Sequence, residues 1–479
     1  MKRLTTIILM LSMCLAAQAK LALSNLCSDG MVLQQNTGAK IWGEATPGSQ
    51  ITITPSWNGS AHKCKTGSDG RWSIRLQTPK GSYRPYSITI KGDSETIKIE
   101  NVLIGEVWLA SGQSNMEMPM RGFFNCPVEN AAGYICSAPA RDRLRMFTVP
   151  KAQSYEPLNG TEGKWEGAEP STIPNMSATA YFFARRINEV TDMPVGIISC
   201  AYGGARVESW IPENMLREHT DENLDHKAIE AMTDYRRPFL MYNAMLCPVK
   251  GYSIKGFIWY QGCSNVGSHD NFVQHMTMLI DHWRSCWDDD RAQLPFYMVE
   301  IAPYRYKPAG ETSYASLLRK AQHDVASSVP NCGIAVTNDL VESYEMDNIH
   351  PAKKKPVGDR LAYLALNRTY GFRSIACDSP EAIKCIRIKD SNELGIVLTN
   401  CDNGLSRWME IEGLEVAGSE GIFYPVRYAY FEWDSKMLRI RSEFVPDPCR
   451  VRYGWGDFRP GNLKNVEGLP VSPFDIRPE

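Results

Sequence analysis

The sequence predicts an α/β protein with a mostly parallel central sheet and β-rich pieces at both ends. Between about residues 102 and 370, apolar runs of the buried-strand type alternate with helical segments, a pattern typical of a parallel sheet covered by helices on both sides. Before and after this part, short β-type runs alternate with turn residues. The length of 479 residues exceeds that of one typical domain and favours two or three domains.

The first 19 residues have the pattern of a cleavable signal peptide. Lys2 and Arg3 give a positive start, residues 7–15 form an apolar core, and Ala17-Gln18-Ala19 is a small-x-small cleavage site. Cleavage after Ala19 predicts export to the periplasm or the extracellular space. No later run of the sequence has the roughly 20 apolar residues of a membrane helix.

The composition is that of an ordinary globular protein, with 43% hydrophobic and 22% charged residues and a formal net charge of −2. This balance lacks the basic domain or stripe that a nucleic-acid surface needs. The 14 cysteines include no C-x-x-C pair and no zinc spacing, so we expect no metal site. Cysteines in apolar runs, such as Cys200, Cys247 and Cys332, are expected to be buried free thiols.

Residues 20–100 are predicted to form an N-terminal domain of the β-sandwich type. Short β-type runs alternate here with turn signals such as Pro47-Gly48 and Ser68-Asp69-Gly70, which favours antiparallel strands. The expected strands cover residues 31–33, 40–42, 50–54, 72–76, 86–91 and 96–99. Because these runs bring no reactive residues together, we expect this domain to have a supporting role.

Residues 101–370 are predicted to form the catalytic domain, and residues 371–479 a C-terminal β-rich domain. In the catalytic domain, strands are expected at 102–110, 195–200, 254–260, 296–301 and 333–336. Helices are expected at 178–190, 271–283, 312–328 and 352–369. In the last part, strands are expected at 386–388, 395–398, 429–433 and 437–440. The sequence leaves open whether the two β-rich ends pack together.

A single stretch organises the central part. The apolar run 102–110 leads into the turn Ser111-Gly112-Gln113-Ser114-Asn115. A buried strand that ends in such a turn presents the turn at the carboxyl edge of the sheet, where open α/β sheets bind their ligands. Ser114 is therefore placed like a nucleophile, although an ordinary polar loop has the same short pattern.

A serine nucleophile needs a general base, an acid that orients the base, and donors for the oxyanion. Two of the eight histidines lie in loops close to an acid. His269 precedes Asp270, and His350 follows Asp347 by three residues, just before a predicted helix. The second spacing lets the acid reach Nδ1 while Nε2 points outward, but a turn that caps the helix is also consistent with it.

Two other strand ends supply candidate oxyanion donors. Gly203 and Gly204 follow the strand at 195–200, and Asn265 follows the strand at 254–260. Glycine allows a backbone N–H to approach a substrate oxygen closely, and an Asn amide is a side-chain donor. Each of these could equally be a tight turn. The order Ser, Gly, Asn and Asp/His along one predicted sheet nevertheless favours a single site.

These blocks resemble those of the SGNH hydrolases, and the longer strings around them resemble the sialate O-acetylesterase family in particular. The similar strings are Gly105-Glu106-Val107-Trp108, Ser111-Gly112-Gln113-Ser114-Asn115-Met116, Gly203-Gly204 with Glu208 and Trp210, Ile258-Trp259-Tyr260-Gln261-Gly262 and Asp347-Asn348-Ile349-His350-Pro351. Residues 28–34 and 467–474 are also similar, so the resemblance spans nearly the whole mature chain. It implies an SGNH-hydrolase-like (flavodoxin-like) α/β/α sandwich with a mostly parallel sheet.

The resemblance implies a serine esterase that removes O-acetyl groups from sugars, above all from sialic acid, through an acyl-enzyme on Ser114. It assigns His350 as the base and Asp347 as the orienting acid. The implied oxyanion hole combines the Ser114 N–H, a Gly203 or Gly204 N–H and the Asn265 amide. No metal or organic cofactor is implied, and the partner is the acetylated sugar.

Contacts to the sugar are expected from four further residues of the similar strings. These are Gln113, Gln261, Arg206 and Glu208. Gln113 is expected either to touch the substrate or to brace its loop.

At one position the sequence departs from the family, because Cys263 stands where Glu is usual. A cysteine supplies neither the charge nor the strong hydrogen bonds of a carboxylate. Since the implied catalytic set does not include this position, we expect altered substrate contacts or loop bracing, with the chemistry retained. Cys263 as the nucleophile is an alternative for which the sequence places no base nearby.

The substrate is open at this stage, because specificity lies in loops that the same catalytic groups can serve. Acetylated plant glycans such as xylan or xyloglucan are an alternative to sialic acid. Arg206, Arg121 and Arg305 could pair the carboxylate of a sialic acid, or could be ordinary surface arginines.

A third interpretation, from a different class, is a catalytically inactive glycan-binding protein. Cys263 and the two β-rich ends motivate it. The presence of Ser114, Asn265, Asp347 and His350 argues against it.

Overall fold

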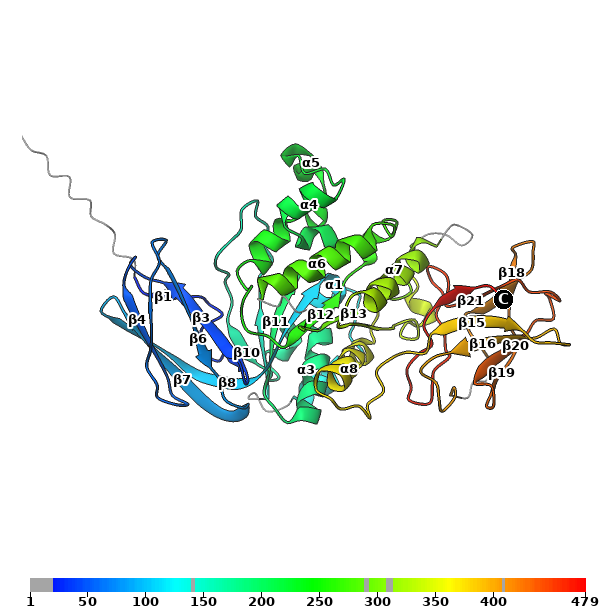
Figure 1. The fold of residues 1–479 in the computed structure, drawn as a ribbon, viewed down its shortest axis with the longest axis horizontal. Helices are drawn as coiled ribbons and strands as arrows, with labels where there is room; N and C mark the ends of the chain where they lie inside the picture. The colour runs from blue at the N-terminus through cyan, green and yellow to red at the C-terminus, as the bar shows by residue number, and fades with distance from the viewer. Residues whose placement is uncertain (1–19, 139–142, 288–292, 307–312, 407–409) are drawn as a thin grey trace, which may run out of the picture.

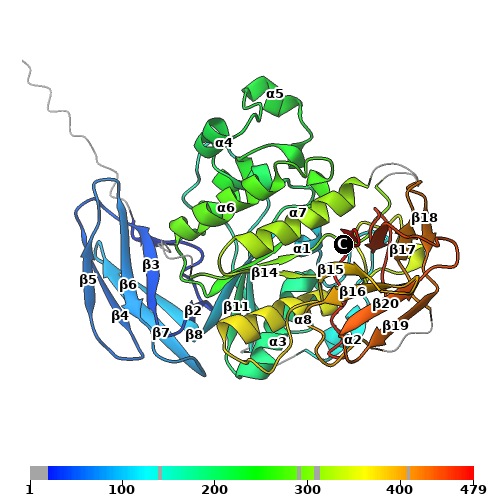
Figure 2. The same cartoon turned by 45° about the vertical axis from the view of Figure 1, so that its right-hand side comes forward.

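The computed structural model describes residues 20–138, 143–287, 293–306, 313–406 and 410–479, and the predicted signal peptide lies outside these ranges. A central α/β part lies between an N-terminal β part and a C-terminal β part (Figure 1). The two β-rich ends are at opposite sides of the central part in both views, so they do not pack together as one unit (Figure 2).

The N-terminal part packs two sheets around an apolar core that includes Ile41, Ile53 and Ile90. One sheet has three antiparallel strands in the order β1 (Ala22–Leu23), β3 (Gly38–Glu44) and β6 (Arg71–Gln77). The other contains β4 (Gln50–Pro55), β5 (His62–Lys65) and β7 (Ser82–Gly92), which pair antiparallel with one another or with β8 (Glu95–Gly112). One strand differs from the antiparallel expectation, since β2 (Val32–Gln34) runs parallel to β8.

Strand β8 connects the N-terminal part to the central part without a break. The sequence predicted two strands here, at 96–99 and 102–110, but the structure has one strand of 18 residues. Asn101 has a φ of 55° between the two predicted segments, a conformation that Asn tolerates better than most residues. The predicted division between residues 100 and 101 therefore falls inside a strand, and the domain limits stay a prediction.

The central sheet has the strand order β10-β9-β11-β8-β12-β13-β14. Its strands are β9 (Leu144–Thr148), β10 (Trp165–Gly167), β11 (Val195–Ala201), β12 (Gly256–Tyr260), β13 (Phe296–Val299) and β14 (Cys332–Ala335), together with β8. All neighbours from β9 to β14 are parallel, and β10 is antiparallel to β9. With the N-terminal strands attached through β8, the whole is a large mixed sheet.

Helices cover both faces of this sheet (Figure 1). Helices α3 (Ala178–Thr191) and α8 (Lys354–Leu364) lie on one face, and α6 (Phe272–Cys286) and α7 (Tyr314–Ser328) lie on the other. The alternation of side chains along a strand explains this division. In β8, Trp108 packs into the core on the α3 and α8 face, whereas its neighbour Leu109 packs into the core on the α6 and α7 face.

Shorter helical segments complete the central part. They are α1 (Ser114–Glu117), α2 (Ala131–Cys136), α4 (Glu213–His219), α5 (His226–Ala231), the 3₁₀ segments Ile173–Asn175, Val207–Trp210, Asp234–Arg236, Cys263–Asn265 and Ser343–Glu345, and the π-helical segments Tyr242–Leu246 and Ala365–Thr369. The helix predicted at 352–369 is thus α8 followed by a π-helical end.

The C-terminal part consists of two four-stranded antiparallel sheets around its own core. One has the order β15 (Ala382–Arg387), β16 (Leu394–Leu398), β20 (Met437–Arg441), β19 (Tyr428–Glu432). The other has the order β18 (Phe423–Pro425), β17 (Leu414–Ala417), β21 (Arg450–Tyr453), β22 (Phe474–Ile476).

Three expectations about composition can be compared with the described residues. Their thirteen cysteines are all free thiols, and Cys200, Cys247 and Cys332 are buried as predicted. No helix among the described residues is both long and apolar enough to cross a membrane. In the same ranges, no cluster of three or more His, Cys, Asp or Glu side chains is arranged to hold a metal ion.

Candidate active site

Ser114 lies at the carboxyl end of β8, as the first residue of α1. Gly112 lets β8 end here against β12, because a Cβ on Gly112, whose φ is 131°, would collide with the carbonyl of Tyr260. A residue at the first helical position has no partner for its backbone N–H within the helix. The Ser114 N–H is therefore suited to the oxyanion role that the sequence assigned to it.

Gly203 lies beside Ser114, but its N–H is already used. A Cβ built on Gly203 would be 3.5 Å from the Cβ of Ser114. The Gly203 N–H donates to Oε2 of Glu117 at 2.6 Å, and the other oxygen of Glu117 pairs with Lys151 at 2.6 Å. In this arrangement Gly203 cannot donate to an oxyanion, contrary to one of the two options that the sequence left open.

Gly204 remains as the glycine donor. Its φ is 82°, and a Cβ there would lie 2.5 Å from the ring of Tyr235, so only glycine fits. Its N–H donates to no other group within the described ranges, whereas its carbonyl accepts from the Ser264 hydroxyl at 2.7 Å.

Asn265 is held in a buried network by Glu208. Its Nδ2 donates to both carboxylate oxygens of Glu208, at 3.2 and 3.1 Å, and its Oδ1 accepts from the backbone of Val207 at 3.1 Å. Burial raises the pKa of Glu208, but the hydrogen bond from His275 Nδ1 at 2.9 Å and the charges of Arg206 and His275 outweigh it and hold the pKa at about 2. The carboxylate therefore stays ionised and fixes the orientation of the Asn265 amide.

Three of the four predicted sugar-binding side chains are buried and brace loops instead. Gln113 is 2% exposed, and its Oε1 accepts from the Gly262 N–H at 2.8 Å, which is the bracing alternative. Gln261 is 0% exposed and donates to Asn265 Oδ1 at 2.7 Å. Glu208 is 3% exposed. In the described arrangement each of these three closes a polar network between strand ends, and their contact with a sugar stays a prediction.

The fourth, Arg206, is also occupied. Its guanidinium pairs with Glu222, donates to the carbonyl of Arg236 at 2.9 Å and lies 3.8 Å from Glu208. With its charge neutralised inside the fold, Arg206 is a structural ion-pair residue in this arrangement.

His350 has the neutral ring that a general base needs. Burial, with a contribution from the charge of Lys354, lowers its pKa to about 4. Its Nε2 is buried without a hydrogen-bond partner among the described residues, and its Nδ1 lies 3.8 Å from Sγ of Cys126. The ring of Phe123 packs edge-on against the imidazole at 5.2 Å. One nitrogen of His350 is thus free for a proton from the nucleophile.

The loop of His350 is fastened to the loop of Ser114 by Asn115. Asn115 Nδ2 donates to the carbonyl of Ile349 at 2.9 Å. The same side chain accepts, at Oδ1, a hydrogen bond from the buried ammonium of Lys354 at 2.5 Å. Base and nucleophile therefore have a common anchor, although no hydrogen bond joins the two side chains directly in the described structure.

Asp347 does not contact His350. Its carboxylate forms a two-pronged ion pair with Arg305, with 2.8 Å between Nε and Oδ1, and its side chain is 62% exposed. In the same turn the Asn348 side chain accepts from the His350 backbone N–H at 3.0 Å. The predicted hydrogen bond from His350 Nδ1 to Asp347 is absent from this arrangement, and the role of Asp347 stays a prediction.

A cavity of about 480 Å³ lies beside α1 and the carboxyl ends of β9 and β11, and it is separated from Ser114 and His350 by the residues that line it. Its wall includes Glu117, which contacts Gly203, and Phe123, which contacts His350. Arg121 also lines it, and its exposed side chain has no carboxylate partner in the described part of the chain. Of the three arginines proposed to pair a sugar carboxylate, Arg121 is the one that the structure leaves available.

The departure at Cys263 lies within electrostatic range of a buried lysine that sequence reasoning missed. Lys354 is 1% exposed, and burial lowers its pKa to about 7, although Cys263, Glu345 and Cys126 act in the opposite direction. Burial likewise raises the pKa of the Cys263 thiol. The only hint in the sequence was a lysine triplet at 353–355, which had no sign of burial.

Comparison with known proteins identifies the class. The family model described as "Carbohydrate esterase, sialic acid-specific acetylesterase" matches residues 104–367, more than half of the chain and the part that carries the strand ends described above. The protein is therefore a carboxylic ester hydrolase of the carbohydrate esterase class. It belongs to the family of sialic acid-specific acetylesterases.

Individual relatives agree with this assignment. The chain is 26% identical to the sialate O-acetylesterases of Pongo abelii and of Homo sapiens, in each case over 498 residues that cover 92% of this chain and 94% of the relative. A crystal structure of a carbohydrate acetylesterase from Xanthomonas citri superposes with a TM-score of 0.82 at 29% identity, covering 95% of this chain and 99% of the other. The similarity thus includes both β-rich ends as well as the central part.

Proposed function

We propose that the protein is an exported sialate O-acetylesterase that uses Ser114 as its nucleophile. One observation carries the proposal: Ser114 lies at the carboxyl end of β8, between the Gly203-Gly204 turn and the loop of a neutral, partly unpartnered His350. The central part is proposed to be an SGNH-hydrolase-like α/β/α sandwich, and residues 1–19 a signal peptide that directs the chain to the periplasm or the extracellular space.

The reaction follows from these groups. His350 Nε2 takes the proton of the Ser114 hydroxyl as the Oγ attacks the acetyl carbonyl. The Ser114 N–H, the Gly204 N–H and the second N–H of the Asn265 amide, the one not held by Glu208, stabilise the resulting oxyanion. The protonated imidazole then gives its proton to the departing sugar oxygen. Water, activated by the same histidine, releases acetate from the acyl-enzyme.

The low pKa of His350 keeps its ring neutral but also makes it a weaker base than an ordinary histidine, so contact with a carboxylate such as Asp347 would strengthen it. A base with a pKa of about 4 is in its neutral form throughout the neutral range, so the free enzyme is always ready to accept the proton. Asp347 would orient the imidazole only after leaving Arg305, so we propose that its position in the reacting enzyme differs from the one described here.

Sialic acid is proposed as the substrate on two grounds. The curated relatives that cover most of this chain are sialate O-acetylesterases. In addition, a cavity of about 480 Å³ suits a single sugar, and Arg121 places a positive charge on its wall, where it can pair with the carboxylate of that sugar.

The deciding experiment is acetate release by the mature protein, with Ser114→Ala as the control. O-acetylated sialic acid and acetylated xylo-oligosaccharides are offered side by side. Preference for the sialic acid supports the proposal. Preference for the xylo-oligosaccharides would leave the esterase mechanism but overturn the substrate, and activity on neither, including p-nitrophenyl acetate, would favour a glycan-binding protein without catalysis.

A further inference from the structure

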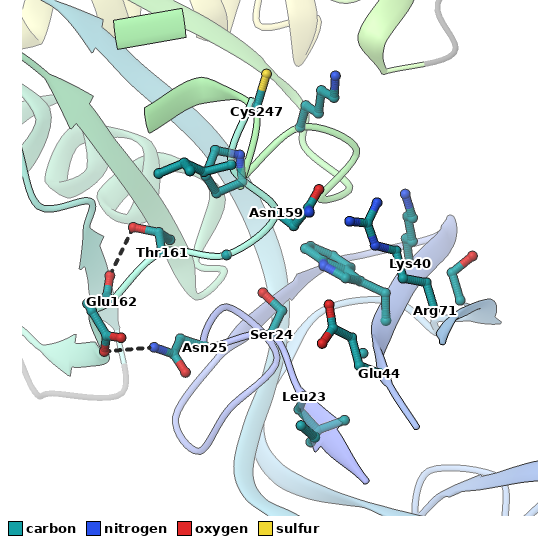
Figure 3. Close-up of a pocket in the computed structure, with 18 of the residues that line it drawn as sticks. Leu23, Ser24, Asn25, Lys40, Glu44, Arg71, Asn159, Thr161, Glu162 and Cys247 are labelled. Atoms are coloured by element: carbon teal, nitrogen blue, oxygen red, sulfur yellow. Dashed lines mark hydrogen bonds between the residues drawn. The ribbon is translucent and has the colours of Figure 1, made fainter. Parts of the chain in front are cut away.

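We propose that the cleft between the N-terminal sheet and the central part binds the neutral oligosaccharide chain that carries the acetylated sugar. This inference rests on the proposed function, because it assigns a second binding site to the same glycan substrate. The cleft has a volume of about 870 Å³, which is within the range of known ligand pockets. It lies between two parts of the chain, where such pockets are common (Figure 3).

One wall of the cleft is the outer face of the three-stranded sheet. Along β3, Lys40, Trp42 and Glu44 alternate with buried residues and face outward. The neighbouring strand β6 adds Ser73 opposite Trp42 and Arg71 opposite Glu44. Trp42 is partly exposed on this wall, and it also packs edge-on against Tyr252 of the central part with 6.0 Å between the ring centroids.

The other wall comes from the central part. It is formed by residues 158–162, with Ala244, Cys247, Pro248 and Lys250 behind them. In Figure 3, Asn159 and Thr161 lie across the cavity from Glu44 and Arg71. A hydrogen bond of 3.3 Å from Asn25 to Glu162 joins the two walls at one end.

The side chains of the cleft favour a neutral polyhydroxyl ligand. Three acidic residues, Glu44, Asp69 and Glu162, are balanced by three basic ones, Lys40, Arg71 and Lys250. Such a balance offers no net attraction to a polyanion or a polycation. The basic side chains can donate hydrogen bonds to sugar hydroxyls and the acidic side chains can accept them. The ring of Trp42 can pack against the apolar face of a sugar ring.

The cleft and the 480 Å³ cavity are separate hollows that share one lining residue. Pro150 lines both of them, and the next residue, Lys151, pairs with the Glu117 that contacts Gly203. A glycan whose terminal acetylated sugar occupies the 480 Å³ cavity can therefore continue past Pro150 into the larger cleft. The shared residue Pro150, together with the balanced charges and the aromatic ring of the cleft, favours the remainder of the substrate as the occupant.

The test compares a glycan-bound substrate with the free sugar. Trp42→Ala and, separately, Asn159→Ala are assayed on an O-acetylated sialylated mucin and on free O-acetylated sialic acid. We expect the ratio of KM for mucin to KM for the free sugar to increase about tenfold, the loss expected when roughly 1.4 kcal/mol of binding is removed. Trp433→Ala is the matched control, because Trp433 is 62% exposed in the C-terminal part, away from both cavities.

An equal ratio in Trp42→Ala, Asn159→Ala and Trp433→Ala would overturn the inference. Trp42→Ala removes an aromatic contact to Tyr252 and could therefore fail to fold. Asn159 is exposed, so Asn159→Ala leaves the core unchanged and still tests the cleft in that case.

A binding measurement separates failure of the cleft from failure of the proposed function. Neutral oligosaccharides released from the mucin and stripped of sialic acid are titrated into the Ser114→Ala protein and followed by tryptophan fluorescence. Saturable binding that Asn159→Ala weakens supports the cleft even if the wild type shows no sialate esterase activity. No binding would overturn the cleft while leaving the esterase proposal intact.

Discussion

The ammonium of Lys354 donates a hydrogen bond to Oδ1 of Asn115 at 2.5 Å, which links the start of α8 to the turn that carries Ser114. Because the Nδ2 of the same asparagine holds the carbonyl of Ile349, one buried side chain positions both the nucleophile loop and the base loop. The positive charge of Lys354 also contributes to the low pKa of His350. A residue outside the predicted catalytic set thus affects two members of it.

Replacement of Lys354 by methionine is expected to move the acidic limb of the pH–rate profile to higher pH. In the wild type, His350 is neutral above a pKa of about 4, so kcat/KM falls only as the pH drops through that value. Methionine removes the repelling charge but keeps the apolar bulk, so the pKa of His350 rises part of the way towards its ordinary value, with burial still opposing protonation. The measurement is kcat/KM for p-nitrophenyl acetate between pH 3.5 and 8, and an unmoved acidic limb would contradict the link.

The pH dependence of the free energy of unfolding gives a second test of the buried Lys354. The Cys263→Glu variant is compared with the wild type and with Lys354→Met. The pKa of Lys354 is about 7 in the fold against 10.5 for an ordinary lysine, so between these values the unfolded chain binds more protons than the folded one. The contribution of Lys354 to the free energy of unfolding therefore increases as pH rises from about 7 to about 10.

Urea titrations at pH 7 and pH 9.5 measure this difference. We expect the wild type to gain stability relative to Lys354→Met over this interval. Cys263→Glu is expected to remove most of the gain, because a carboxylate beside Lys354 keeps the ammonium charged in the fold at both pH values. Parallel behaviour of all three proteins would mean that Lys354 does not titrate in this window.

Replacement of Glu208 by glutamine is expected to lower kcat without much change in KM. The carboxylate accepts hydrogen bonds from Asn265 and His275, and an amide in its place would turn an N–H towards one of those donors. Loss of one oriented oxyanion donor costs on the order of 10²–10³ in kcat. The loss should be the same for p-nitrophenyl acetate and for acetylated sugars, because the oxyanion is common to all of them.

Glu222→Gln is the control for this change. Glu222 also pairs with Arg206 but does not contact Asn265 in the described structure, so its replacement should leave kcat within a factor of about two, as for a partly exposed ion pair. Equal losses in the two variants would assign the effect to Arg206 and not to the orientation of Asn265.

The relative losses of kcat in His350 and Asp347 variants test the proposed catalytic set of Ser114, His350 and Asp347. His350→Ala removes the base and is expected to cost on the order of 10⁴ in kcat. Asp347→Asn is expected to cost less, since the base remains and the acid forms an exposed pair with Arg305. Arg305→Gln frees Asp347 to reach the imidazole and should not lower kcat. If Arg305→Gln were as damaging as Asp347→Asn, Asp347 would act through Arg305 and not through His350.

The sequence could predict features that depend on residues close together along the chain. The end of β8 at Ser114, the glycine turn after β11 and the helices flanking the sheet follow from local patterns of apolar and turn residues. It could not predict the partners of Glu208 and Asp347, because His275 lies 67 residues from the first and Arg305 lies 42 residues before the second.

The same limit applies to the predicted sugar contacts of Gln113 and Gln261. Gln113 and Gln261 belong to strings at strand ends, which correctly indicated their place at the edge of the sheet. Whether such a side chain faces the cavity or the neighbouring loop depends on how two loops distant in sequence meet, and here both glutamines bond across that junction. A positive φ at Asn101, which lets two predicted strands become one, is likewise a property of the assembled sheet.

Arg121 is expected to determine the preference for an acidic sugar. Arg206 and Arg305 are neutralised by Glu222 and Asp347, whereas the exposed guanidinium of Arg121 lies on the wall of the 480 Å³ cavity, where the other cation, Lys151, is paired with Glu117. Arg121→Gln should increase KM for O-acetylated sialic acid by about tenfold or more, because a charge-assisted pair with the carboxylate is lost. KM for an acetylated xylo-oligosaccharide, which has no carboxylate, should not increase. Arg84→Gln, a change at an exposed arginine of β7, is the matched control and should alter neither value. An equal increase in KM for both substrates would show that Arg121 affects the shape of the cavity and does not bind the carboxylate of the sugar.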